Sequence, residues 1–73
     1  MNPYPIEIFW SDEDQAFIAI APDLPGCSAG GATEMEALQE LQIAMQLWLE
    51  AAAKMGRKAP APSRRDRYAT AGE

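Results

Sequence analysis

Residues 33–56 are the only segment whose pattern predicts a long helix, and this limits the possible folds more than any other feature. Thr33 is a suitable N-cap, and Glu36 can reach back to the cap amide, as in a capping box. Gly56 suits the position after the helix, and two prolines, Pro60 and Pro62, prevent its continuation. Apolar residues recur at spacings of three and four, at Leu38, Leu41, Met45, Trp48, Ala52 and Met55. We interpret this stripe as the core-facing side of one helix.

The first half of the chain predicts strands. Residues 4–10 are rich in β-branched and aromatic side chains, with Ile6, Ile8 and Trp10 on one face. Residues 16–21 form a second such run after a polar turn, so the two predict an antiparallel hairpin. Prolines then end the second strand, and residues 27–31 indicate a brief third one.

Both predicted strands carry apolar side chains on both faces. Phe9 lies opposite to Ile8, and Ile18 and Ile20 lie opposite to Phe17. A single helix covers only one face of a sheet, so the other face needs a second copy, a partner, or the loops and tail to cover it. We therefore expect an α+β fold, a small antiparallel sheet with one helix packed on one face, which forms a homo-oligomer through the sheet.

The net charge of −5 conceals a division of the chain. Residues 1–53 hold nine acidic and no basic residues, whereas residues 54–73 hold all six basic residues and two acidic ones. An acidic body attracts basic proteins and repels nucleic-acid phosphates, although acidity also simply keeps a small protein in solution. We expect one domain at residues 1–62 and a basic, flexible tail at residues 63–73, which alternatively orders as a strand on a partner.

The chain has no histidine, which removes most catalytic and metal-binding classes. Ser-His and Cys-His pairs cannot form, and Cys27 alone makes neither a zinc site nor an internal disulfide. We expect a small buried Cys27 side chain, no enzyme activity, no metal and no cofactor. No apolar run approaches the ~18 residues that span a bilayer, and no secretion signal is visible, so we expect a cytoplasmic protein.

Residues 21–38 resemble the HicB antitoxin family. The resemblance rests on the string Pro22-Asp23-Leu24-Pro25-Gly26-Cys27 followed by Thr33, Glu36, Ala37 and Leu38, with Ala32 where an aspartate often stands. It covers about residues 4–62 and implies a partial RNase H-like fold, β-β-β-α with a possible last strand. It also implies a partner, the small basic mRNA-cleaving toxin HicA, whose active site the antitoxin covers. Only eleven residues follow Pro62, so we do not expect the C-terminal DNA-binding domain that many members carry. We therefore do not expect this chain alone to bind DNA.

The sequence therefore predicts a non-enzymatic antitoxin that sequesters a HicA-type toxin. The contacts that we expect from charge and exposure are Asp12, Glu13 and Asp14 in the hairpin turn, with Asp23 and a protruding Leu24 in the proline loop. One alternative is a stand-alone homo-oligomer of the same fold without a toxin. Another is a metal-dependent nuclease remnant that uses the same carboxylates, although acids side by side in a turn are typically solvated.

Overall fold

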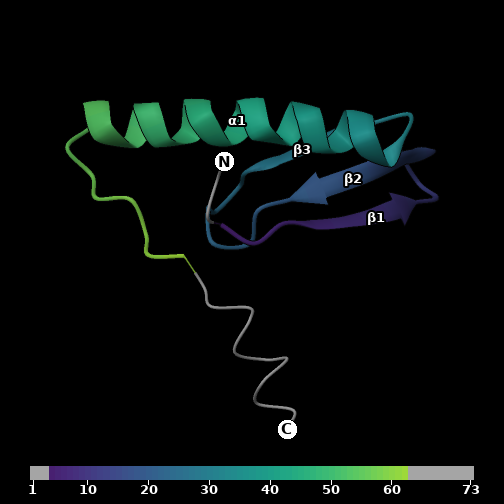
Figure 1. Ribbon diagram of the computed structural model, residues 1–73, viewed down its shortest axis with the longest axis horizontal. Helices are drawn as coiled ribbons and strands as arrows, with labels where there is room; N and C mark the ends of the chain where they lie inside the picture. Colours follow the sequence, from purple (N-terminus) through teal and green to yellow (C-terminus); the bar gives the residue numbers. More distant parts are fainter. Residues whose placement is uncertain (1–3, 63–73) are drawn as a thin grey trace, which may run out of the picture.

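The computed structural model describes residues 4–62, in which three strands precede one helix (Figure 1). The elements are β1 (Glu7–Ser11), β2 (Ala16–Ile20), β3 (Ser28–Gly31) and α1 (Glu34–Lys54). The strands form an antiparallel sheet in the order β1-β2-β3, and α1 lies across one face of it. The predicted α+β fold is confirmed, while the tail and its possible strand lie outside the described residues.

Local contacts define both ends of α1. The Thr33 hydroxyl accepts the Glu36 amide hydrogen at 3.1 Å, so Thr33 is the N-cap that the sequence predicts. The Glu36 carboxylate accepts from the Ala32 amide at 2.8 Å, one residue before the cap amide that we expected. At the other end Gly56 has a φ of 75° and donates its amide hydrogen to the Ala53 carbonyl, in a glycine C-cap.

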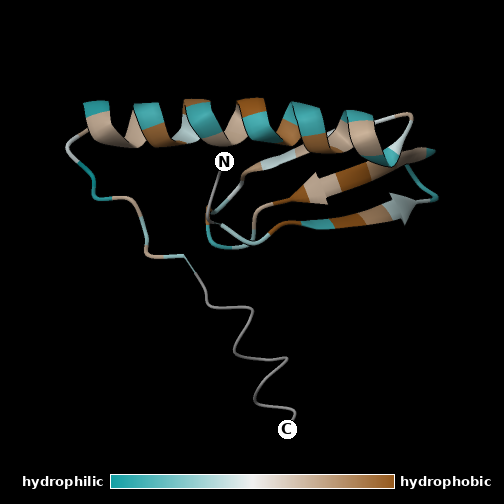
Figure 2. Cartoon of the chain, in the orientation of Figure 1, coloured by the Kyte–Doolittle hydropathy of each residue, from teal (hydrophilic) through white to brown (hydrophobic). Residues whose placement is uncertain are grey.

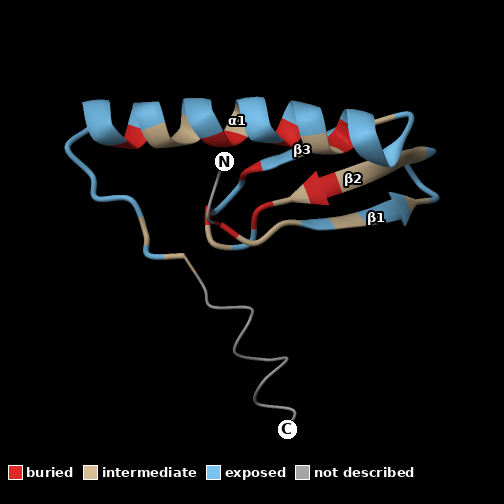
Figure 3. Ribbon diagram, viewed as in Figure 1, coloured by how far each residue is buried: buried red, intermediate tan, exposed pale blue. Residues whose placement is uncertain are grey.

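The core lies between α1 and the sheet face that it covers (Figure 3). Its buried residues are Tyr4, Ala19, Ala21, Leu24, Cys27, Ala37, Leu41 and Met45. Small residues contribute to the core between α1 and the sheet, where Ala19 of β2 and Ala37 of α1 have no exposed surface. A Cβ added to Gly31, at the end of β3, would lie 2.6 Å from the Ala37 amide nitrogen. The first turn of α1 therefore lies directly against β3.

The helix is longer than the sheet. Twenty-one helical residues span about 31 Å, whereas a five-residue strand spans about 17 Å, so the C-terminal half of α1 extends past the strands (Figure 1). This half lies over the loop at residues 21–27, and Trp48 donates its indole hydrogen to the Pro25 carbonyl at 3.0 Å. Met55, which we expected in the core stripe, is 68 % exposed because it follows the last turn that packs.

The second face of the sheet carries no helix in the described part of the chain. Cross-strand pairing places Phe9 beside Ile18, and Ile20 follows on the same face. Phe9 is half exposed, and Ile18 lies against Gly30 of β3, whose added Cβ would be 3.4 Å from the Ile18 Cδ1 atom. Hydrophobic side chains thus continue onto the open face, as the sequence predicts. Figure 2 shows the hydrophobic residues of β2 in brown.

Trp10 shares the helix-covered face with Ile8, as predicted, but it remains half exposed. The reason is its position at the end of β1, since α1 packs mainly over β3 and β2. The Trp10 and Phe17 rings pack edge to face, with ring centroids 5.1 Å apart.

Candidate partner-binding surface

The hairpin turn at residues 12–15 displays three exposed carboxylates in a fixed geometry. The Trp10 indole donates a hydrogen bond to Asp12 Oδ1 at 2.8 Å, and the Ser11 hydroxyl donates to Asp14 Oδ2 at 3.0 Å. Glu13 lies between them at the tip. Because Asp12 and Asp14 hold the turn together as well as carrying charge, their side chains are already ordered before any partner arrives.

The fold adds two more carboxylates to this end of the molecule. Three antiparallel strands bring the chain back to the hairpin end, where Gly31 pairs with Phe17, and α1 then begins with Glu34 and Glu36 in its first turn. The basic residues of the described chain, Lys54, Arg57 and Lys58, follow at the far end of α1. The result is an acidic end formed by Asp12, Glu13, Asp14, Glu34 and Glu36, of which the sequence alone indicated only the three carboxylates of the hairpin turn. The number of predicted strands could have indicated this grouping. After three antiparallel strands, the chain is back at the end of the sheet that holds the turn between the first two strands.

Leu24 does not protrude, so that expectation is wrong. The loop consists of two consecutive turns, in which the Leu24 amide donates to the Ala21 carbonyl at 3.0 Å and the Cys27 amide donates to the Leu24 carbonyl at 2.9 Å. Gly26, with a φ of 79°, takes the left-handed position of the second turn. This path directs Leu24 inward beneath the overhanging half of α1, where it is 1 % exposed. Leu24 therefore stabilises the loop and is not available to a partner.

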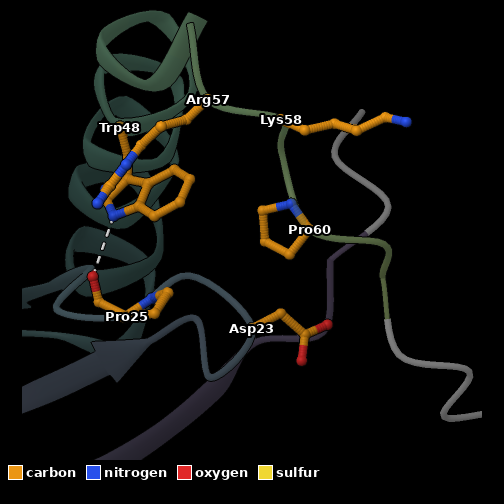
Figure 4. Close-up of a pocket in the computed structure, with 6 residues that line it drawn as sticks. All are labelled: Asp23, Pro25, Trp48, Arg57, Lys58 and Pro60. Atoms are coloured by element: carbon orange, nitrogen blue, oxygen red, sulfur yellow. Dashed lines mark hydrogen bonds between the residues drawn. The ribbon is translucent and has the colours of Figure 1, made fainter. Parts of the chain in front are cut away.

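Asp23 lies in a different place from the turn carboxylates. It lines a cleft of about 460 Å³ together with Pro25, Trp48, Arg57, Lys58 and Pro60 (Figure 4). One wall is the proline loop, bonded to Trp48, and the other is the segment after α1, where the Tyr4 hydroxyl donates to the Pro60 carbonyl. Because β1 and β2 are antiparallel, the loop after β2 lies at the opposite end of the sheet from the turn after β1. Asp23 is therefore separated from the turn carboxylates Asp12, Glu13 and Asp14.

Cys27 is buried, as the sequence predicts, and desolvation by burial raises the pKa of its thiol. We expect iodoacetamide at mildly alkaline pH to modify it about tenfold more slowly in the folded protein than in urea. The folded state favours the protonated Cys27 thiol. The thiol therefore contributes fully to stability below its pKa in the unfolded chain, and this contribution is lost as the pH rises through its pKa in the folded protein. A Cys27→Ala variant should lose this alkaline dependence, and equal labelling of folded and unfolded protein would contradict the burial.

Residues 4–62 contain no group of three cysteine, aspartate or glutamate side chains arranged to hold a metal ion. Within the same described range, no helix combines the length and the apolarity needed to cross a membrane.

Within residues 4–62, the fold and its surface define a small acidic α+β unit in which one face of the sheet carries no helix. The profile of the family described as "HicB_like antitoxin of bacterial toxin-antitoxin system" matches residues 4–73, and the chain belongs to this family. The predicted resemblance is thereby confirmed, and the family is one of antitoxins.

Two curated proteins illustrate the similarity. The chain is 46 % identical over 57 residues to UPF0150 protein ssl0259 of Synechocystis sp., covering 78 % of this chain and 77 % of that protein. It is 36 % identical over 53 residues to UPF0150 protein Ta0767 of Thermoplasma acidophilum, covering 73 % and 77 %. No solved structure matches the chain, so the partial RNase H-like fold stays a prediction.

Proposed function

We propose that the chain is an antitoxin that binds and sequesters a small basic mRNA-cleaving toxin of the HicA type, without catalysing a reaction itself. Membership of the antitoxin family supports a toxin partner. The observation that carries the proposal further is the acidic end, where five carboxylates from the hairpin turn and the start of α1 gather with no basic residue before Lys54. Such a field attracts a cationic protein and raises its association rate.

Asp12, Glu13 and Asp14 are the contacts that we propose at the acidic end. They are exposed, and two of them are already ordered by hydrogen bonds within the turn. Asp23 lies at the opposite end, close to Arg57 and Lys58 in the cleft, so its role as a contact stays a separate prediction.

We expect a small basic protein to be encoded beside the gene of this chain, and co-expression of the two proteins tests the proposal. The wild-type chain should co-purify with that basic protein and restore the growth of cells in which that protein is toxic. The Glu13→Gln/Asp14→Asn variant keeps hydrogen-bond acceptors but removes two charges, and we expect association about fivefold slower at low salt, with the difference shrinking as salt is added.

The matched control is Glu7→Gln compared with Glu13→Gln alone, because each removes one negative charge and Glu7 lies at the other end of β1 and is not a proposed toxin contact. An equal loss in both variants would show that net charge alone matters and would contradict the assigned contacts. Failure of wild-type protein to bind or neutralise its neighbour would contradict the proposed function.

We also propose that two copies associate through the open face of the sheet. Glu7 is the charged residue of the strands on this face, which otherwise presents Phe9, Ile18 and Ile20 beside small side chains. We expect a dimer in sedimentation equilibrium that a Phe9→Thr substitution weakens, because threonine suits a strand but removes the apolar contact. A wild-type monomer at high concentration would contradict it, whereas a stable dimer with no toxin partner would favour the stand-alone oligomer.

A further inference from the structure

The helix carries a second apolar group on the side turned away from the sheet. Ile43 is 55 % exposed and Leu47 is 60 % exposed, although both lie in the middle of α1. Residues four apart are neighbours on a helix surface, so the two side chains form one continuous apolar area. Hydrophobic colouring accordingly appears on the outer side of α1 in Figure 2, on the side that Figure 3 shows as exposed.

Charged residues extend this area in both directions along the helix. Spacings of four, three, four, three and four residues place one row on a single face, which comprises Glu36, Glu40, Ile43, Leu47, Glu50 and Lys54. All six are exposed. The apolar centre is therefore bordered by carboxylates on both sides, with a base only at the final position.

Within residues 4–62, this apolar centre does not take part in the core. The inward side of α1 already packs through Ala37, Leu41 and Met45, which lie roughly opposite to the outer row. Isoleucine is also a weaker helix former than alanine or glutamate, so helix formation does not account for Ile43. An apolar centre inside a charged border is the usual arrangement of a protein-binding surface.

We propose that the outer face of α1, centred on Ile43 and Leu47, is a docking surface for a basic protein that places apolar side chains between lysines or arginines. The inference rests on the proposed function and names the surface of this chain that the partner covers. The outer row starts at Glu36, which belongs to the acidic end, so one partner can reach both the row and the hairpin turn.

A second copy of this chain fits the outer face poorly. The outer row of each copy has three carboxylates and one base, so a twofold pairing would press two surfaces of net negative charge together and place Glu40 opposite Glu50 of the other copy. The open sheet face, by contrast, has Glu7 as its charged strand residue. Charge thus assigns the two apolar surfaces to different occupants, the sheet face to a second copy and the helix face to a cationic partner.

The test compares two double variants of the full chain. Ile43→Ala/Leu47→Ala removes the apolar centre, and the helix should persist because alanine is the best helix former. Met35→Ala/Met55→Ala is the matched control, since these methionines are 62 % and 68 % exposed and each lies eight residues from the nearer member of the pair. Both variants should show unchanged helical circular dichroism and thermal unfolding.

Binding is measured by calorimetry with two probes. One is the basic protein encoded beside the gene, and the other is a synthetic amphipathic leucine-lysine helix, with an all-lysine peptide of equal charge for comparison. We expect Ile43→Ala/Leu47→Ala to weaken binding of either partner about 30-fold, and the methionine control to stay within about twofold of wild type.

Each outcome decides a different point. If the wild-type chain binds its neighbour and the Ile43→Ala/Leu47→Ala variant binds equally well, the docking surface is wrong while the proposed function stands. If the wild-type chain ignores its neighbour, the proposed function fails. The docking surface is then upheld by loss of leucine-lysine peptide binding in that variant, and overturned if variant and wild type bind the peptide equally.

Discussion

Replacing Leu24 with alanine is expected to lower the free energy of unfolding by about 3 kcal/mol, within the range that cavity formation costs at a buried leucine. Leu24 is 1 % exposed and lies beneath the overhanging half of α1, where the double turn holds the backbone on both sides of it. A domain of this size has a total stability of only about 5 kcal/mol, so the variant should be close to unfolding at 37 °C. Urea titration followed by tryptophan fluorescence measures the change, because Trp48 is bonded to the neighbouring Pro25.

The matched control is Leu47→Ala, the same substitution at a leucine that is 60 % exposed. We expect the control to change the free energy of unfolding by less than about 0.5 kcal/mol. Leu24→Met, which nearly conserves volume, should cost less than about 1.5 kcal/mol. If Leu24→Ala proved as stable as Leu47→Ala, Leu24 would be a surface residue after all, as the sequence alone had indicated.

The second large effect is expected at Gly31. An added Cβ would lie 2.6 Å from the Ala37 amide nitrogen and 2.7 Å from the Glu36 Cβ atom, and both belong to the first turns of α1. Backbone cannot yield as a flexible side chain does, so Gly31→Ala must push the start of the helix away from β3. We expect a loss of about 2–3 kcal/mol, measured by thermal and urea unfolding.

Gly30→Ala provides the comparison for this prediction. Its Cβ would point to the open face and lie 3.4 Å from the Ile18 Cδ1 atom, the end of a flexible side chain. Glycine is unfavourable in a strand interior, so we expect Gly30→Ala to be neutral or to add about 0.5 kcal/mol. Equal losses at the two adjacent glycines would contradict the close approach of α1 to β3.

Local signals predicted the elements of the fold well. The N-cap at Thr33 and the C-cap glycine at Gly56 depend on contacts between residues only a few positions apart, and the structure has both. The alternation of Ile8 and Phe9 likewise predicted which strand residues share a face, because side chains in a strand alternate whatever the strand packs against.

The wrong expectations concern residues whose surroundings come from distant parts of the chain. Proline and glycine around Leu24 correctly predicted a tight turn but not the side on which α1 would overhang it. Spacing placed Met55 in the core stripe, although the sheet ends before the helix does. Ile43 and Leu47 fall outside the predicted apolar stripe. Only the packing of α1 on the sheet shows that they face away from the core.

The sequence by itself determined where the helix starts and stops, how the strand side chains alternate, and that the acidic residues precede all the basic ones. These properties depend on neighbouring residues or on simple order along the chain. Tertiary structure decided that the hairpin turn and the start of α1 share one end, that Leu24 is buried, and that the outer face of α1 stays exposed. Such properties depend on strand register and on the length of the helix relative to the sheet, which no short segment specifies.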